Sequence, residues 1–394
     1  MLESLAIENF KIHKQLNIDL GNLTVLTGLN SSGKSSIIQA LLLLRQSFLQ
    51  GVINEGLLLN GDILSVGLCR DALCHDADND FISFGIQAGV LSSWKWRADS
   101  AIMGKDFLPI LETNNTESES LKKFSLFTNE FQYISAARQE PSETYPLNTN
   151  LVETKKQISQ KYGKCELAAH FLHYYGVERK IQVLEGLKRN DEDASDLLSQ
   201  VSSWEHIISP DVSVIPEKGD KSYSLGYSYK IGGDTSQPFS ATNVGFGLSY
   251  SLPIIVALLS AERGSLILIE NPEAHLHESA QSELGTMIAR AAQAGVQVIV
   301  ETHSNHIING ILVASKRQED GDKGVERSKV KLYYVKKQDN ILQSEFEEIK
   351  IEEGGKIDHQ PDGFFNRIES DMTYLLGEDG DSTVYSFARA CRDY

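Results

Sequence analysis

Residues 28–35 read Gly-Leu-Asn-Ser-Ser-Gly-Lys-Ser and fit the pattern G-x-x-x-x-G-K-[ST]. Glycines and small side chains let backbone N–H groups close around a phosphate, and the positive end of a helix dipole strengthens the attraction. In such a loop Lys34 reaches the β- and γ-phosphates, and Ser35 ligates Mg²⁺. The pattern also needs a strand before it and a helix after it, and residues 23–28 and 34–50 have those periodicities. The sequence therefore predicts a loop that binds ATP with Mg²⁺.

A second group of chemical residues follows an apolar run, Leu-Ile-Leu-Ile, that ends in Glu270. A buried strand that delivers one carboxylate to the edge of a sheet can hold Mg²⁺ through water. The residues after it are Asn271, Pro272 and Glu273, so the position after the acid is an amide. An amide orients water but cannot accept its proton. Glu273 is a candidate for the missing acid, and the choice between Asn271 and Glu273 stays open.

These residues need an α/β scaffold to position them. The first 50 residues predict three strands followed by a helix, and residues 241–310 return to the same alternation. Strands that are apolar on both faces indicate a mostly parallel sheet flanked by helices. Helical periodicity between them, over 165–208, predicts a helical insertion. The expected elements of the second half are a helix at 249–261, a strand at 265–270, a helix at 279–295, a strand at 296–304 and a helix at 305–315.

The domain organisation follows from this pattern of elements. We expect an N-terminal half of the core over 1–90, an insertion with a helical subdomain over 91–235, a C-terminal half over 236–315 and a small C-terminal domain over 316–394. The fold class is therefore α/β with a split core.

Composition bounds the function further. The chain has 394 residues, 41% hydrophobic and 23% charged, which is typical of a globular protein. Its formal charge of −17 argues against a surface that broadly embraces nucleic acid, although a local groove for DNA or RNA stays open. The longest apolar run, at 252–261, is shorter than a membrane helix needs, and the first residues lack a signal-peptide pattern. We expect a cytoplasmic protein with no membrane partner.

Four segments taken together resemble a known family. They read LAIENFKIHKQLNIDLGNLTVLTGLNSSGKSS, NVGFGLSYSLPIIVALL, LILIENPEAHLH and VIVETHSNHIING, in that order. They are similar to the two halves of an ABC-type AAA ATPase head of the RecF, SMC and OLD (overcoming lysogenization defect) group. The resemblance is strongest to single-chain prokaryotic ATPases with a short C-terminal domain of unknown function, here at 354–376.

The resemblance implies a role for individual residues. Glu270 would be the Walker B acid and His303 a switch histidine that reads the γ-phosphate, while residues 244–249 would occupy the place of the ABC signature. Arg138 would be a charge near the nucleotide or the dimer contact. The implied catalytic set is Glu270, Asn271, Glu273 and His303, with Ser35 and Glu270 at the metal. The implied nucleotide-binding set is Gly28, Asn30, Ser31, Ser32, Gly33, Lys34, Ser35, Ser36, Arg138, Gly245, Gly247 and Ser249.

The resemblance also implies partners and an activity. We expect slow ATP hydrolysis by a homodimer, or a higher homo-oligomer, that closes around ATP and regulates a separately encoded effector such as a nuclease, in anti-phage defence or DNA maintenance. An alternative is an OLD-like ATPase with its own metal-dependent nuclease, for which 349–358 and 378–382 supply acids at an unfavourably short spacing. A transporter-type ATPase subunit is a further alternative, which the opening segment disfavours.

Overall fold

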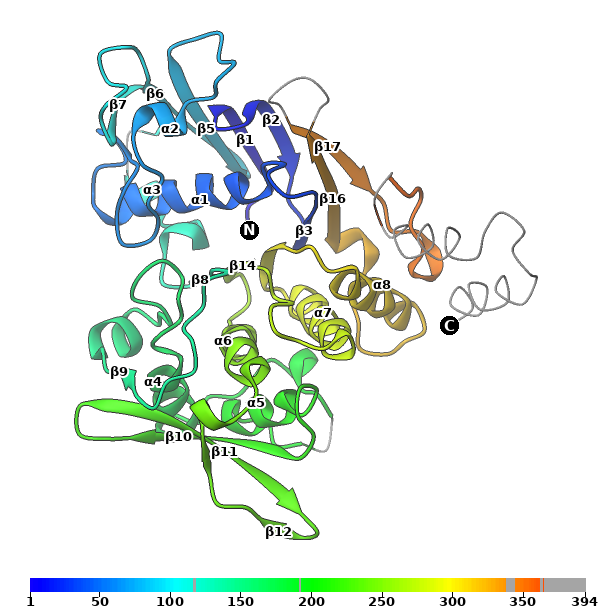
Figure 1. Cartoon of the computed structure of the whole chain (residues 1–394). Helices are drawn as coiled ribbons and strands as arrows, with labels where there is room; N and C mark the ends of the chain where they lie inside the picture. Colours follow the sequence, from blue (N-terminus) through cyan, green and yellow to red (C-terminus); the bar gives the residue numbers. More distant parts are fainter. Residues whose placement is uncertain (116–117, 191–192, 338–343, 362–363, 365–394) are drawn as a thin grey trace, which may run out of the picture.

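The computed structural model describes residues 1–115, 118–190, 193–337, 344–361 and 364 (Figure 1). Its centre is a six-stranded core sheet in the order β17-β16-β3-β15-β14-β8. Neighbouring strands from β16 to β8 are parallel, and β17 joins the edge antiparallel to β16. The strands are β3 (Leu23–Gly28), β8 (Phe131–Ile134), β14 (Leu266–Glu270), β15 (Gln297–Glu301), β16 (Val330–Lys337) and β17 (Ser344–Ile349).

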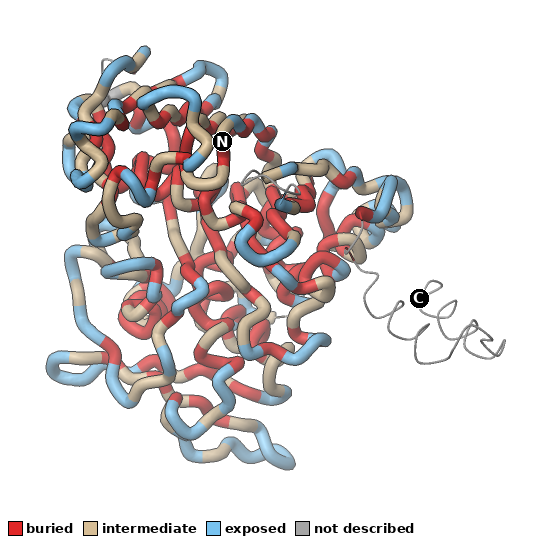
Figure 2. The backbone as a smooth tube through the Cα atoms, turned by 45° about the horizontal axis from the view of Figure 1, so that its top comes forward, coloured by how far each residue is buried: buried red, intermediate tan, exposed pale blue. Residues whose placement is uncertain are grey.

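Alternate side chains of the core sheet enter two different hydrophobic cores. On β14, Leu266 and Leu268 pack with α1 (Lys34–Leu49), whereas Ile267 and Ile269 pack on the opposite face. This is why the strands read as continuous apolar runs. The opposite face is covered by α6 (Phe246–Ser260), α7 (Glu278–Gln293) and α8 (Asn305–Glu319). Figure 2 shows the buried residues, in red, running through the middle of the molecule.

A second, wholly antiparallel sheet covers the other side of α1. Its order is β2-β1-β5-β6-β7-β4, and its core is continuous with that of α1. Helix α1 is buried between the two sheets because residues 37–44 carry apolar side chains at almost every position. The strands are β1 (Ser4–Phe10), β2 (His13–Asp19), β4 (Gly56–Leu58), β5 (Phe81–Ala88), β6 (Val90–Arg97) and β7 (Phe107–Thr113), and short helices α2 (Cys69–Ala72) and α3 (Ser118–Leu121) lie between or after them.

The region predicted as a helical insertion is helical only at its two ends. A first helix, α4 (Ala168–Phe171), continues into the π-helical turn η3 (Leu172–Glu178), and a second, α5 (Leu197–Glu205), follows an irregular stretch. The prediction of helix over 180–187 was wrong apart from the short turn η4 (Glu185–Leu187). A third sheet follows, in which β11 (Ser222–Ile231) pairs with β10 (Val212–Lys218), β12 (Asp234–Thr235), β13 (Phe239–Ser240) and β9 (Tyr145–Pro146). Figure 1 shows it at the end of the molecule opposite the N-terminal sheet.

The three domain boundaries stay predictions, but each of the three sheets runs across at least one of them. The N-terminal sheet continues past residue 90 through β6 and β7, and β16 and β17 join the core sheet from beyond residue 315. Strand β3, which leads into the loop at residues 28–35, is therefore paired directly with β16 from the C-terminal region. Among the described residues, no helix combines the length and the apolar character that crossing a bilayer requires.

Candidate active site

The loop at residues 28–35 connects β3 to α1, as the pattern required. Gly28 has φ 129° and Gly33 has φ 100°, a region of backbone conformation that glycine enters without strain. A Cβ atom on Gly28 would lie 2.0 Å from the carbonyl oxygen of Val335 on β16, so a side chain has no room there. Glycine at both positions is thus a requirement of this backbone path.

Lys34 folds back on the loop that carries it. Its Nζ donates to the carbonyl oxygens of Gly28 at 3.0 Å and Leu29 at 2.6 Å, and burial lowers the pKa of the ammonium group. Its charge is therefore held at the mouth of the loop by carbonyl groups, which a phosphate oxygen can replace as a partner.

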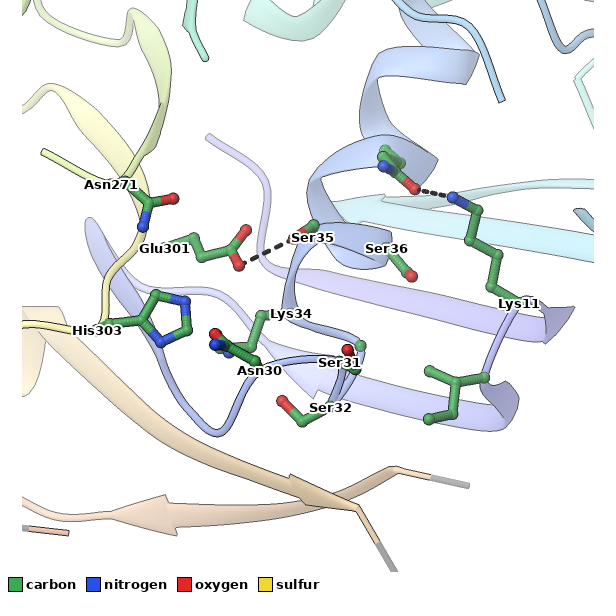
Figure 3. Close-up of a pocket in the computed structure, with 13 residues that line it drawn as sticks. Lys11, Asn30, Ser31, Ser32, Lys34, Ser35, Ser36, Asn271, Glu301 and His303 are labelled. Carbon is green, nitrogen blue, oxygen red and sulfur yellow. Dashed lines mark hydrogen bonds between the residues drawn. The ribbon is translucent and has the colours of Figure 1, made fainter. Parts of the chain in front are cut away.

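A cavity of about 410 Å³ opens beside this loop (Figure 3). It combines the loop with the turn between β1 and β2 and with the ends of β14 and β15. The lining residues are Lys11, Ile12, Asn30, Ser31, Ser32, Gly33, Lys34, Ser35, Ser36, Gln39, Asn271, Glu301 and His303. Most of the loop residues that the sequence singled out thus meet Asn271 and His303 at one site. The predicted residues that do not line it are Gly28, Arg138, Gly245, Gly247, Ser249, Glu270 and Glu273.

The end of β14 carries the predicted acid and the amide. Glu270 accepts a hydrogen bond from the N–H of Ala136 at 3.2 Å, and burial raises its pKa. Asn271 has φ 45°, in the left-handed region that asparagine tolerates better than most residues. The backbone turn after β14 therefore gives a physical reason for asparagine at this position.

Arg138 stabilises the turn that follows β14. It is 3% exposed, and its guanidinium donates to the carbonyl oxygens of Ser135 at 3.2 Å, Glu270 at 2.9 Å and Asn271 at 2.7 Å. The ring of Tyr250 lies 5.5 Å from the guanidinium. The resemblance implied a charge near the nucleotide or the dimer contact, whereas in this structure Arg138 is buried against backbone and lies outside the cavity lining.

Glu273 connects the end of β14 to the end of β15. Its two carboxylate oxygens accept from the hydroxyl of Thr302 at 2.7 Å and from the N–H of His303 at 2.9 Å, and the Asn271 amide lies 3.4 Å from the second of these oxygens. Both oxygens are therefore engaged in supporting the histidine. Burial, together with the charge of Lys34, lowers the pKa of His303, which favours the neutral imidazole.

Glu301 is the cavity residue that the sequence reasoning missed. It is the last residue of β15, it is 5% exposed, and its Oε1 accepts from the Ser35 hydroxyl at 2.9 Å (Figure 3). Burial and the neighbouring charge of Glu270 raise the pKa of Glu301 to about 7. Its place two residues before His303, at the end of an apolar strand like the one before Glu270, was the available signal.

Lys11, Ile12 and Gln39 were missed as well. Lys11 lies in the tight turn between β1 and β2, and its Nζ donates to the Gln39 side chain at 2.5 Å. The sequence gives no spacing rule that brings this turn to α1, because the contact depends on how the N-terminal sheet packs.

The predicted signature segment lies at the start of α6, with Gly245 as the residue before its first turn. Gly245 and Phe246 are exposed, and Gly247 is buried with the carbonyl oxygen of His275 3.1 Å from where its Cβ would be. Ser249 was expected to offer its hydroxyl to an anion, but it is 6% exposed and faces Tyr227. Gly247 and Leu248 are buried as well, so Ser249 belongs to a buried stretch that directly follows the exposed start of α6.

Strands β17 and β2 both contact the loop at residues 28–35. The hydroxyl of Ser344 on β17 donates to the carbonyl of Ser32 at 2.5 Å, and the ring of His13 on β2 donates to the carbonyl of Gly33 at 2.9 Å. Burial lowers the pKa of His13 to about 4, so the ring is neutral near pH 7. Two sheets therefore fix the loop from outside its own strand and helix.

Comparison with known proteins agrees with this geometry. Residues 1–85 and 99–308 match the family described as AAA ATPase domain. The chain belongs to the AAA ATPase domain family. Members of this family are ATPases, and the chain is accordingly an enzyme that binds and hydrolyses nucleotide. Residues 325–375 match DUF3696, a family of unknown function, and this match includes β16 and β17 and begins before the segment expected from the sequence.

Solved structures support the fold of the AAA ATPase domain. An SMC head bound to the winged-helix domain of ScpA is 13% identical, covers 89% of this chain and 98% of its own, and has a TM-score of 0.50. An SMC head with an extended coiled coil, bound to the C-terminal domain of ScpA derived from Pyrococcus furiosus, is 14% identical, with 89% and 96% coverage and a TM-score of 0.50. The fold is thus that of an ABC-type P-loop ATPase head, as predicted. No curated protein matches the chain.

Proposed function

We propose that the cavity beside residues 28–35 is the ATP site of this ATPase. The observation that carries the proposal is the meeting of the loop, Asn271 and His303 around one cavity of about 410 Å³. Backbone N–H groups of the loop and the start of α1 would hold the phosphates, and Lys34 would exchange its two carbonyl partners for phosphate oxygens.

A divalent cation fits the donor groups at this site. Mg²⁺ prefers oxygen ligands and binds with phosphates and one or two carboxylates, and it would neutralise charge on the phosphates. Ser35 offers a hydroxyl to the cavity, and Glu270 ends the strand next to β15. We propose that Ser35 holds it and that Glu270, as expected from the resemblance, supports it from the end of β14.

We propose that Asn271 and His303 lie next to the end of the nucleotide at which hydrolysis takes place. Asn271 lines the cavity and can orient a water by hydrogen bonds, but it cannot take the proton. Glu273 accepts from the N–H of His303 with one oxygen and from the Thr302 hydroxyl with the other, and it does not line the cavity, so we propose it as a positioning residue. Slow hydrolysis is the expected result.

The ATPase is also proposed to close as a homodimer that regulates a separately encoded effector, in anti-phage defence or DNA maintenance. The exposed start of α6, with Phe246 52% exposed, gives a surface for a second protomer. The SMC heads with this fold were solved with ScpA bound, which supports a partner protein as the kind of output. The alternative of a built-in nuclease relied partly on 378–382, which lie outside the described residues.

Replacing Lys34 by alanine tests the site. Lys34→Ala is expected to abolish ATP binding in calorimetry with Mg²⁺, because the loop loses its only side-chain cation for the phosphates. The control is Lys14→Ala, a surface lysine whose ammonium pairs with Asp78 at 2.7 Å. Equal affinity for ATP in Lys34→Ala and Lys14→Ala, with both proteins folded, would refute the assignment.

Replacing Phe246 by aspartate tests the dimer. The change puts a charge on the exposed start of α6 and leaves the loop untouched, so ATP binding should persist while ATP-dependent dimerisation disappears. Light scattering with a slowly hydrolysed ATP analogue measures this. Dimerisation at the wild-type level in Phe246→Asp would remove α6 from the interface.

A further inference from the structure

Two acids end adjacent strands of the core sheet at the same level. Glu270 of β14 and Glu301 of β15 are paired in register, and β15 lies directly beside the loop strand β3. Parallel strands place the residues at their carboxyl ends on one edge of the sheet, where ligands bind in α/β folds. Of these two acids, Glu301 is the one on the strand nearer to the loop, and it alone lines the cavity.

The contacts of Glu301 are incomplete. Its Oε1 accepts from the Ser35 hydroxyl at 2.9 Å, but its Oε2 is buried and has no hydrogen-bond partner among the residues that the structure describes. A buried carboxylate oxygen without a donor is costly, and such a group in a native site points to a missing ion, water or ligand.

The surroundings of Glu301 are also short of positive charge. The repulsion between Glu270 and Glu301 acts in a buried setting, and Lys34, whose charge attracts the Glu301 carboxylate, gives its hydrogen bonds to two loop carbonyls. Glu270, by contrast, accepts from the N–H of Ala136 and interacts with the phenol of Tyr133. A divalent cation next to Ser35 would supply the missing charge and a partner for the free oxygen.

We propose that Glu301, from β15, is the carboxylate that holds the divalent cation together with Ser35, either directly or through one water. Glu270 then acts as a more distant support on the neighbouring strand. This inference rests on the proposed ATP site, and it moves the acid closest to the cation from the end of β14 to the end of β15.

The test compares Glu301→Gln with Glu270→Gln in nucleotide binding, which needs no turnover. ADP affinity is measured by calorimetry in EDTA and again in Mg²⁺, and the number of bound Mn²⁺ ions is counted by electron paramagnetic resonance in the presence of ADP. Glutamine keeps the size of Glu301 and can still pair with Ser35, so thermal unfolding should change little.

Glu301→Gln is expected to keep the metal-free affinity for ADP and to weaken binding of Mn²⁺ in the ADP complex by about 10- to 100-fold, the range for groups that support a metal. Glu270→Gln is expected to weaken it less. Glu301→Asp keeps the charge on a shorter arm and should restore part of the loss.

Two results would overturn the inference while leaving the ATP site in place. One is wild-type Mn²⁺ binding by Glu301→Gln, and the other is an equal loss of ADP affinity in EDTA and in Mg²⁺, which means that Glu301 only shapes the loop. If wild-type protein and Lys34→Ala bind ADP equally weakly, the proposed site itself fails, and the inference fails with it.

Discussion

The ends of β14 and β15 lie side by side at the cavity but are held in different ways. After β14, Arg138 grips the backbone carbonyls of Glu270 and Asn271. After β15, Glu273 grips the hydroxyl of Thr302 and the N–H of His303. Arg138 lies far from β14 in the sequence, whereas Glu273 belongs to the turn that directly follows β14. Any shift of the β14 turn is therefore passed to His303 through Glu273.

This difference explains how an amide can stand where an acid was expected. Since Arg138 donates only to backbone atoms, the turn does not require an acid at residue 271, and its φ of 45° favours asparagine. The side chain of Glu273 is more constrained, because both of its oxygens are used. The acid after Pro272 is thus a structural link between the two strand ends, and the acid on β15 faces the cavity.

Removing Arg138 should have the largest effect, because both strand ends depend on it. Arg138→Met leaves three backbone carbonyl groups without their charged donor, and we expect a loss of about 2 to 4 kcal/mol in the free energy of unfolding. ATP turnover per folded molecule should also fall. Urea unfolding and steady-state hydrolysis measure the two effects.

Arg45→Met is the matched control for Arg138→Met. Arg45 is also buried and donates to the carbonyls of Leu126 and Thr128, but it does not contact either strand end. A comparable loss of stability without loss of turnover is expected. An equal loss of turnover in both variants would show that buried arginines in general, and not the β14 turn, control the site.

Glu273→Gln should come next, with an effect on turnover and little on binding. A glutamine offers only one oxygen, so it cannot accept from both the Thr302 hydroxyl and the His303 N–H. His303 should therefore shift, and a misplacement of this kind costs about 100-fold in rate. The double variant Glu273→Gln/His303→Ala should be no slower than His303→Ala alone. Additive losses in that pair would instead make Glu273 an independent participant in hydrolysis.

Substitutions at Asn271 should have smaller effects. They should distinguish the role of its backbone conformation from that of its side-chain amide. Asn271→Ala is expected to lose about 1 kcal/mol because alanine is strained in the left-handed region, and Asn271→Gly should recover that stability. Both should slow hydrolysis by about tenfold, the value of one lost hydrogen bond to water. Wild-type turnover in Asn271→Gly would show that the amide does not orient the water.

Glu205→Gln should leave turnover unchanged and alter only the pH dependence of stability. Glu205 on α5 is fully buried, accepts from the Ser251 hydroxyl, and has its pKa raised well above 4.5 by burial. A raised folded-state pKa means that its stabilising contribution is complete below the unfolded value and is lost as pH rises through the folded value. In urea unfolding, the variant should therefore gain stability relative to the wild type as the pH rises from 4.5 toward the folded-state value. A constant difference over that range would contradict the shift.

The sequence predicted three of the six strands of the core sheet, β3, β14 and β15, and the loop, because their signals are local. Apolar strands such as 266–270, and the glycine-lysine pattern at 28–35, carry their structure within a few residues. The rest depends on strand order. Glu270 and Glu301 are 31 positions apart in the chain, and only the register of β14 with β15 makes them neighbours.

The burial of Ser249 and the position of Arg138 could not be predicted for a related reason. The spacing of residues 244–249 does not say which side of α6 faces Tyr227, and an arginine in a loop shows no sequence sign of the three carbonyls it will meet. The third sheet was missed, although the alternation of serine or glycine with tyrosine or leucine over 222–229 is a strand signal.

The position of β3 in the core sheet has a consequence for biosynthesis. The strand and its loop leave the ribosome early, but both sheet neighbours of β3 come late, β15 near residue 300 and β16 near residue 335. At ordinary speeds of translation the loop waits for roughly 10 to 60 seconds before either neighbour exists. During that time α1 can be covered only by the N-terminal sheet, whose strands are close to it along the chain. A nascent chain therefore cannot assemble its nucleotide site until most of its length has been made.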